Sequence, residues 1–408
     1  MRIANYDIAV IGGGASGMIA AGYAALNGKK VVLIEQNEKL GKKLLITGKG
    51  RCNITNAALT SKDLVNVFGK NGKFLYSSFN EFDVEMTIGF FNELGLATKV
   101  ERGNRVFPVS DKAVDVVKVL ESFLKKNNVK IIFNECAAKV EHVNNHVQKI
   151  ITDRYEVNAE KYIIATGGLS YKSTGSKGDG FRWAKKMGHT VIPTKPVLTP
   201  LILKEIWIKQ LEGLSLKNVQ ITAFANNKKI EERFGEALFT SNGISGPIIL
   251  DMSTKVKEGN ILSIDFKPAL TDDMLDKRIQ RDFKENINRV FKNSLSKLLP
   301  KKLIPVIIEQ SHIDPDKKVN SITKDERMRL VELVKHFKVN VTGTIGYEKA
   351  VVTSGGIKLS EIDPKTMKSK LIDNLYFTGE VLDIDGPTGG YNLQIAWTTG
   401  HAAGAGVY

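Results

Sequence analysis

Three glycines near the start of the chain, Gly12, Gly14 and Gly17, separate an apolar run at residues 8–11 from a run of helix-forming residues. A second apolar run ends at Glu35. In this pattern the first glycine permits a tight turn, the second lets a pyrophosphate approach the backbone, and the third lets a helix pack closely on a sheet. The N–H groups of a helix beginning near Ala15 can hold the diphosphate, and the Glu35 carboxylate can accept a ribose hydroxyl. The spacing therefore predicts a unit that binds an ADP-ribose group.

A second glycine-rich stretch, residues 386–390, lies near the C-terminus and follows Gly379 and Glu380. A simple NAD-binding domain has no need of such a returning segment, whereas FAD extends beyond the pyrophosphate into a ribityl chain and a flavin ring. Glu380 is placed to bind ribityl hydroxyls, and a helix starting near Asn392 can direct N–H groups at the flavin. The two chain ends together predict FAD. The alternative is a plain glycine-rich turn before a C-terminal helix.

The segments after Glu35 supply elements that must position these residues. A long loop rich in lysine and glycine covers residues 37–56, and loops of this length are usually functional. Apolar periodicity then predicts helices at residues 61–68, 83–94, 111–127 and 178–187. Strands are predicted at residues 129–133, 137–143, 149–152 and 161–166.

Three prolines between residues 193 and 200 mark an exit from this first domain. Apolar runs at 219–225, 237–239 and 261–266 predict a small, mainly β unit, and helical spacing predicts a helical insertion over 271–333. Strand character returns near 343–352, and a last strand at 375–378 leads to a final helix that reaches residue 402. The C-terminal segment is therefore expected to rejoin the first domain.

Composition narrows the classes of function. The 408 residues are 42% apolar and carry a formal charge of +15. Because the excess lysines occur as short pairs spread along the chain, the pattern favours a solvated surface over a nucleic-acid groove. Two cysteines and six histidines give neither a disulfide framework nor a metal signature. Without a leader or a membrane-spanning run, we expect a cytoplasmic protein with no membrane partner.

Several short motifs occur in a familiar order. They are GKGRCN at residues 48–53, RVFP at 105–108, ATGG at 165–168, GISGP at 243–247, VTSGG at 352–356, GEVLD at 379–383 and GGYNLQ at 389–394. With these motifs the chain resembles, over nearly its whole length, the aminoacetone-oxidase-like or dehydro-bile-acid-reductase-like family of NAD(P)/FAD-dependent flavoprotein oxidoreductases.

The resemblance implies an α/β fold. A Rossmann-like FAD-binding domain would be built from both chain ends, with an inserted β-barrel-like domain that itself carries a helical domain. The implied division is 1–192 and 350–408 for the FAD-binding domain, 193–268 and 334–349 for the inserted β domain, and 269–333 for the helical insertion. The layout inferred from periodicity agrees with this division.

The resemblance also implies which residues hold the cofactor. The ADP half would contact Gly12, Gly14, Ala15, Ser16, Gly17 and Glu35, with the backbone around Ala137 near the adenine. Lys43 and Arg51 would lie near phosphates or flavin, and the remainder of FAD would contact Cys52, Asn53, Thr166, Gly167, Glu380, Asp385, Gly390, Asn392 and Leu393. Three alternatives stay open, with Lys43 as a surface residue, Ala137 as a packing residue and Asp385 as a turn cap.

The implied activity is an oxidoreductase in which hydride equivalents pass through flavin N5, while the protein supplies orientation and electrostatics. The family labels imply either oxidation of a small amine by O2 or reduction of a conjugated ketone by NAD(P)H. A second glycine fingerprint for NAD(P) is absent, so a nicotinamide would visit the flavin only transiently. The rival hypotheses are a flavin-dependent enzyme that modifies RNA and a non-catalytic flavin or nucleotide sensor.

Candidate residues on the substrate side are Arg51, Arg105 and Tyr171, each of which has a structural alternative. Cys52 could form a flavin adduct, but the loop has no CxxC partner and a non-redox cysteine is favoured. The family pattern leads us to expect a histidine before the GISGP motif, whereas this chain has Ser241 and Asn242. No acid–base role is therefore assigned at that position.

Overall fold

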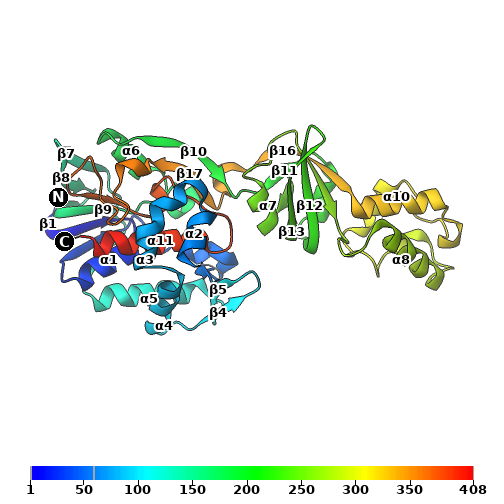
Figure 1. Ribbon diagram of the computed structural model, residues 1–408, viewed down its shortest axis with the longest axis horizontal. Helices are drawn as coiled ribbons and strands as arrows, with labels where there is room; N and C mark the ends of the chain where they lie inside the picture. The colour runs from blue at the N-terminus through cyan, green and yellow to red at the C-terminus, as the bar shows by residue number, and fades with distance from the viewer. Residues whose placement is uncertain (1, 58–59, 408) are drawn as a thin grey trace. The chain divides into compact units, whose positions relative to one another are not determined.

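The computed structural model describes residues 2–57 and 60–407, apart from the side chain of Ser61 (Figure 1). The chain forms two compact units. The first unit combines residues 1–196 and 350–408, and the second consists of residues 197–349. Both ends of the chain therefore belong to the same unit.

A seven-stranded sheet forms the centre of the first unit. Its parallel part contains β6 (Lys130–Ile132), β2 (Val31–Ile34), β1 (Arg2–Ile11), β9 (Tyr155–Ile164) and β18 (Leu375–Phe377). An antiparallel hairpin of β7 (Lys139–Val143) and β8 (His146–Ile151) continues from the first half of β9. Residues 8–11 and 31–34 are buried throughout, as expected for parallel strands covered on both faces.

Two helices from opposite ends of the chain pack closely in this unit. They are α1 (Ala15–Leu26) and α11 (Tyr391–Ala405) (Figure 1). A Cβ on Gly400 would lie 2.6 Å from the Ser16 carbonyl oxygen, and a Cβ on Gly404 would lie 2.4 Å from that of Ala20. Only glycine allows the two backbones to approach this closely. The C-terminal glycines thus fix α11 against the predicted dinucleotide-binding helix.

Further elements complete the first unit. The helix α5 (Ala113–Lys126) packs beside α1, where the Phe123 ring fills the space next to Gly22. A small antiparallel sheet is formed by β3 (Thr55–Asn56), β5 (Arg105–Pro108) and β4 (Thr98–Glu101). The remaining helices and strands are α2 (Ser61–Val67), α3 (Tyr76–Glu81), α4 (Val84–Glu93), α6 (Asp179–Lys186) and the pair β10 (Val191–Val197) with β17 (Val352–Ile357).

The second unit contains a closed barrel and a group of helices. The barrel order is β11 (Leu201–Leu203), β14 (Gly243–Ser245), β13 (Lys228–Thr240), β12 (Ser215–Ala225), β15 (Ile261–Asp265) and β16 (Phe337–Thr344). Buried residues alternate along β16, at Phe337, Val339 and Val341. The helices are α7 (Pro247–Met252), α8 (Asp272–Glu285), α9 (Ile304–Ser311) and α10 (Lys324–Lys335).

The predicted fold class is confirmed, since the Rossmann-like sheet, the antiparallel barrel and the helical elements are all present. The returning strand predicted near 343–352 is wrong in its position. The strands are β16 (Phe337–Thr344) and β17 (Val352–Ile357), and β16 begins directly after α10 without turn residues that could mark its start. The five-part division by residue number stays a prediction. Among the described residues no helix is long and apolar enough to cross a membrane.

Candidate functional site

The turn after β1 brings Gly12, Gly14 and Gly17 together at the start of α1. Gly12 has a φ of +106°, and a Cβ there would lie 2.5 Å from the Ala165 carbonyl oxygen. A Cβ on Gly17 would lie 1.9 Å from the Gly12 carbonyl oxygen. In contrast, a Cβ on Gly14 would meet no described atom within 4 Å. The first and third glycines are therefore required by packing, while the second leaves the backbone open at the N-terminus of the helix.

Glu35 lies beside this turn at the end of β2. Its side chain is buried, and its Oε2 accepts a hydrogen bond of 2.7 Å from the Gly13 N–H. Its Oε1 accepts from the backbone N–H and the side-chain amide of Asn37, at 2.8 and 2.6 Å. The Glu135 N–H donates to the Glu35 carbonyl at 3.1 Å. Ala137, two residues further along the chain, is buried. The acid predicted for ribose recognition is thus held at the glycine turn.

The loop after β9 carries the next group of predicted residues. The Thr166 hydroxyl oxygen is buried and has no hydrogen-bond partner among the described residues. Gly167 has a φ of +71°. A Cβ on Gly168 would lie 2.5 Å from Thr353 Oγ1 and 2.8 Å from Glu380 Oε1. This loop therefore touches both β17 and the segment that follows β18.

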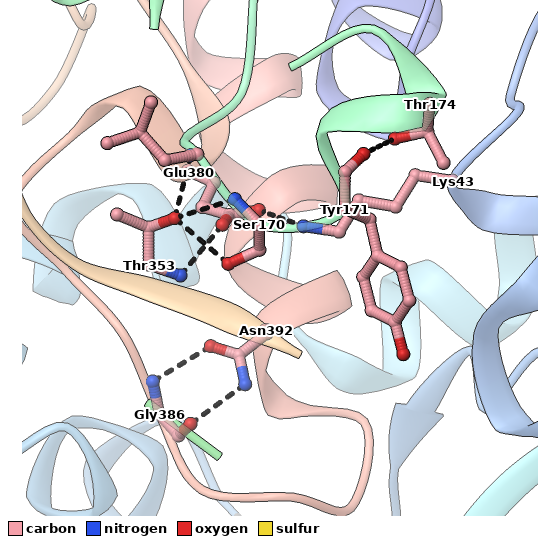
Figure 2. Close-up of polar contacts among 9 residues, drawn as sticks. Lys43, Ser170, Tyr171, Thr174, Thr353, Glu380, Gly386 and Asn392 are labelled. Atoms are coloured by element: carbon pink, nitrogen blue, oxygen red, sulfur yellow. Dashed lines mark hydrogen bonds and ion pairs between the residues drawn. The ribbon is translucent and has the colours of Figure 1, made fainter. Parts of the chain in front are cut away.

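Glu380 joins parts of the chain that are far apart in sequence (Figure 2). The Lys43 ammonium lies 2.6 Å from Glu380 Oε2, and the Thr353 N–H donates to Glu380 Oε1 at 2.8 Å. The Thr353 hydroxyl oxygen accepts from the N–H groups of Leu169 and Ser170 at 2.8 and 3.2 Å, and lies 3.0 Å from Ser170 Oγ. Two predicted residues, Lys43 and Glu380, are thus brought together at the edge of the loop after β9.

The C-terminal glycine stretch is fixed by its own side chains. Asn392 Oδ1 accepts from the Gly386 N–H at 2.8 Å, and its amide donates to the Gly386 carbonyl at 2.8 Å (Figure 2). Gly390 has a φ of +106°, and a Cβ there would lie 2.5 Å from the Thr55 backbone. Because the Asn392 amide is committed to this loop, the group it leaves for a ligand is the backbone N–H. Leu393 is half-buried on the first turn of α11.

Asp385 is half-buried in the same stretch. Burial raises the pKa of its carboxyl group, the Ser354 side chain and the charge of Lys195 lower it, and the charge of Glu380 adds to the rise. This carboxyl group therefore takes up a proton more readily than an exposed aspartate.

Arg51 lies in a cluster of four charged side chains. Its guanidinium contacts Glu101 Oε1 and Asp111 Oδ1, each at 2.5 Å, and lies 4.1 Å from the centre of the Phe107 ring. Lys99 completes the cluster, with its ammonium 2.7 Å from Asp111 Oδ2. Two carboxylates thus balance the two cations, so the contacts of Arg51 favour its structural alternative over a substrate contact.

Cys52 and Asn53 follow Arg51 in this loop. The Cys52 thiol is fully buried, and burial raises its pKa to about 12. The thiol is therefore protonated at neutral pH, which supports the prediction of a non-redox cysteine. Asn53 Oδ1 is buried and accepts no hydrogen bond from the described residues.

The other substrate-side candidates occupy different surroundings. The Arg105 side chain donates to the Arg102 carbonyl at 3.0 Å and lies 5.9 Å from the centre of the Phe107 ring, contacts that favour its structural alternative. Tyr171 has a left-handed backbone, with φ +53° and ψ +58°. The VTSGG motif at residues 352–356 did not allow the role of Thr353 as acceptor for the loop after β9 to be predicted. The acceptor arrangement depends on contacts across more than a hundred residues and has no local signal.

The residues around the glycine turn suit a long dinucleotide. Open backbone at Gly14 lies at a helix N-terminus, where an anionic phosphate is favoured. The unpartnered oxygens of Asn53 and Thr166 are buried polar groups of the kind that a ligand satisfies. The turn lies at the carboxyl end of β1, where α/β sheets bind their ligands. Among the described residues no cluster suits a metal ion.

The family match and the full-length similarity to a reductase class the chain as an FAD-dependent oxidoreductase of the Rossmann type. It belongs to the HI0933-like protein Rossmann domain family, whose model matches residues 6–406. The chain is 34% identical to the 3-dehydro-bile acid delta(4,6)-reductase of Clostridium scindens, over 97% of this chain and 98% of that protein. It is 32% identical to the ribosomal RNA dihydrouridine synthase of Haemophilus influenzae, over 96% of each chain.

Solved structures share the fold at low sequence identity. The 3-ketosteroid-delta4-(5alpha)-dehydrogenase of Rhodococcus jostii matches with a TM-score of 0.56 and 13% identity, over 99% of this chain and 97% of that one. The 3-ketosteroid delta1-dehydrogenase of Sterolibacterium denitrificans matches with a TM-score of 0.51 and 13% identity, over 99% of each chain. These likenesses concern the fold alone.

Proposed function

We propose that this protein uses FAD to reduce a carbon–carbon double bond conjugated to a carbonyl group in a small molecule, with NAD(P)H as a transient electron donor. The observation that carries the proposal is the full-length similarity to two kinds of enzyme with related chemistry. A delta(4,6)-reductase acting on a 3-dehydro-bile acid saturates double bonds conjugated to a ketone. Dihydrouridine likewise differs from uridine by saturation of a ring double bond conjugated to a carbonyl.

The first group of proposed contacts holds the ADP half of FAD. Backbone N–H groups of Gly14, Ala15 and Ser16 would bind the diphosphate at the start of α1, where the helix dipole favours negative charge. Gly12 and Gly17 would act indirectly, because their close packing shapes the turn. Glu35 would accept a ribose hydroxyl with the lone pairs that Gly13 and Asn37 leave free. The backbone around Ala137 would adjoin the adenine.

The second group holds the flavin half, which supplies a hydride equivalent at N5 when FAD is bound. Asn53 and Thr166 would use their unpartnered buried oxygens, and Glu380 would bind ribityl hydroxyls. Lys43, already paired with Glu380, would place its charge near the phosphates. The remaining proposed contacts are the backbone at Cys52, Gly167, Gly390, Asn392 and Leu393, and the Asp385 carboxyl group. Arg51 would contribute to binding of the flavin half only by stabilising its own loop, since the Arg51 charge is balanced by Glu101 and Asp111.

An anaerobic two-step experiment tests the proposal. The FAD-loaded protein is mixed with NADH or NADPH, and loss of the oxidised flavin absorbance is followed. The reduced protein is then mixed with a 3-oxo-Δ4 steroid or with O2, and a separate sample of the oxidised protein is mixed with an aliphatic amine. We expect rapid reduction by one nicotinamide and rapid reoxidation by the conjugated ketone. Reduction of the oxidised flavin by the amine, with O2 as the acceptor, would support amine oxidation instead. A flavin that neither nicotinamide nor amine reduces would support a sensor.

RNA is the second candidate substrate. The relatives that make dihydrouridine in ribosomal RNA favour it, and the formal charge of +15 permits it. The test incubates the reduced holoprotein with unmodified ribosomal RNA and measures dihydrouridine, together with RNA affinity at several salt concentrations. Dihydrouridine formation with steeply salt-dependent binding would support the RNA substrate. Binding that is absent or independent of salt, without dihydrouridine, would exclude it.

A further inference from the structure

The buried carboxylate of Glu35 has two different oxygens. Its Oε2 accepts one hydrogen bond, from the Gly13 N–H at 2.7 Å. Its Oε1 accepts two, from the Asn37 backbone N–H at 2.8 Å and from the Asn37 side-chain amide at 2.6 Å. Because each carboxylate oxygen has about two lone pairs, the described residues fill Oε1 and leave one position on Oε2. The oxygen left open for a ligand is therefore the one beside the glycine turn.

The side-chain amide of Asn37 is held in one orientation. Its nitrogen donates to Glu35 Oε1 and to the Thr174 carbonyl, at 2.6 and 3.0 Å. Its oxygen accepts from the Lys42 ammonium at 3.3 Å. A reversed amide would place its oxygen against two acceptors and its N–H groups against an ammonium, so the three partners together select the observed orientation.

The surroundings of Asn37 hold both its backbone and its side chain in place. The Asn134 N–H donates to the Asn37 carbonyl at 3.2 Å. The Thr174 N–H and hydroxyl donate to the Tyr171 carbonyl, each at 2.8 Å, which closes the loop that receives the Asn37 amide (Figure 2). Gly175 has a φ of +115°, and a Cβ there would lie 2.9 Å from the Asn37 amide nitrogen. A glycine thus lets this loop approach Asn37 closely.

Gln36 offers a comparison within the same segment. Gln36 and Asn37 are both half-buried, and the Gln36 amide donates to the Gly175 carbonyl at 2.6 Å. The described contacts of the Gln36 side chain do not include the Glu35 carboxylate. Both amides therefore bind the loop at residues 171–175, whereas Asn37 also joins this loop to Glu35.

We propose that Asn37 is a positioning residue for ribose recognition, an inference that rests on the proposed function. The terminal torsion of a glutamate is broad, so its two oxygens readily change places unless hydrogen bonds hold them. By filling Oε1, the Asn37 amide keeps the open lone pair of Oε2 available to a ribose hydroxyl of the cofactor. Binding then costs less conformational freedom, and a nucleotide that carries ribose hydroxyls is preferred over one that lacks them.

The test compares Asn37→Ala with Gln36→Ala. Both changes remove one amide bonded to the loop at residues 171–175, and the first also removes a contact to Glu35. The cofactor-depleted full chain is titrated with ADP and with 2′,3′-dideoxy-ADP, which lacks the ribose hydroxyls. The ratio of the two Kd values reports the ribose contact, because general loosening of the site weakens both ligands. The Tm of each protein is measured as well.

For the wild type and for Gln36→Ala we expect ADP to bind about 10-fold more tightly than dideoxy-ADP. For Asn37→Ala we expect a ratio below about 3-fold, with dideoxy-ADP bound within about 2-fold of the wild-type Kd.

Three results would overturn the positioning role and leave the proposed function intact. They are an Asn37→Ala protein with the wild-type ratio, an Asn37→Ala protein that binds both ligands equally more weakly, and a ratio that falls as far in Gln36→Ala. A wild-type protein that binds ADP and dideoxy-ADP with the same Kd would overturn the proposed contact between Glu35 and the ribose, and the role of Asn37 with it.

Discussion

At the scale of single residues, most charged and polar side chains around the candidate site are already paired with each other. Lys43 is bonded to Glu380, and Glu35 is bonded to Gly13 and Asn37. Side chains that are fixed before a ligand arrives lose little conformational freedom when it binds. Backbone N–H groups and a few unpartnered oxygens are then left to meet the cofactor.

The sequence allowed Glu35 to be predicted at the glycine turn, because the motif spacing is local. It did not allow the surroundings of Arg51 to be predicted. Its partners Glu101 and Asp111 lie 50 and 60 residues further along the chain and reach it only through the fold. A cation in a loop rich in lysine and glycine has no sequence signal that distinguishes a phosphate partner from a carboxylate partner.

The charge cluster gives a pH-dependent prediction. Bonding to Arg51 lowers the pKa of Glu101, and bonding to Lys99 and then Arg51 lowers that of Asp111. Carboxylates with a lowered folded-state pKa contribute stability above their unfolded-state pKa and lose it as the pH falls through the folded-state value. Arg51→Ala should therefore have a lower Tm than the wild type at pH 7, and the difference should disappear as the pH falls through the lowered folded-state pKa of the two carboxylates. Thermal unfolding from pH 2 to 8 measures this, with the exposed Arg289→Ala as the control. A difference that does not change with pH would contradict the electrostatic origin.

The two cysteines give a prediction about reactivity. With a pKa of about 12 and full burial, the Cys52 thiol should not react with a thiol reagent such as DTNB in the native protein. Cys136 is exposed and should react. We expect one reactive thiol per native chain and a second after unfolding in guanidinium chloride. Rapid reaction of both thiols in the folded protein would show that the loop around Cys52 opens.

At the scale of helices and strands, a buried hydrogen-bond network positions α11. The Gln394 side chain is fully buried, accepts from the Thr55 hydroxyl at 2.6 Å, and donates to the Thr87 hydroxyl at 2.9 Å and the Asp83 carbonyl at 3.1 Å. The Trp397 indole donates to the Ile54 carbonyl at 2.9 Å. The helix that carries Asn392 and Leu393 is thereby held against β3 and the N-terminus of α4.

Gln394→Leu should destabilise the protein, because the Thr55 hydroxyl and the Asp83 carbonyl would lose a buried partner. We expect a loss of about 1–3 kcal/mol in the free energy of unfolding. FAD affinity should fall as well, since the N-terminus of α11 is proposed to meet the flavin. Denaturant unfolding and FAD titration measure the two effects, and Gln148→Leu on the protein surface is the control. Unchanged stability would mean that the network does not hold the helix.

Some elements could be predicted from the sequence and others could not. The sequence was sufficient for α1, α5 and the strands β1, β2 and β18, whose buried runs are apolar. The strand predicted at 161–166 is β9, which begins at Tyr155, because polar and charged residues interrupt the apolar pattern of its first half. Periodicity failed for β10, which contains Pro193 and Pro196 in a region predicted to be irregular. Proline is tolerated there because β10 belongs to a two-stranded sheet, where only one of its edges must form hydrogen bonds.

At the scale of the whole molecule, one compact unit contains every glycine segment of the candidate site. It is formed by residues 1–196 and 350–408, and β10 pairs with β17 on either side of the inserted residues. Replacing residues 198–348 by a short glycine–serine linker should therefore leave a folded protein that binds FAD within about 10-fold of the wild-type Kd. Circular dichroism and FAD fluorescence measure fold and binding. A folded truncated protein that binds no FAD would mean that the second unit contributes to the cofactor site.

The most direct test of the account is the FAD content of the native protein. Gently purified protein should show the oxidised flavin absorbance bands, and FAD titrated into cofactor-depleted protein should saturate at one molecule per chain. A binding site formed by the glycine turn at residues 12–17 and the stretch at 386–390 predicts tight binding of one FAD per chain. Protein that circular dichroism shows to be folded, yet that contains no flavin and takes up none at micromolar FAD, would contradict it.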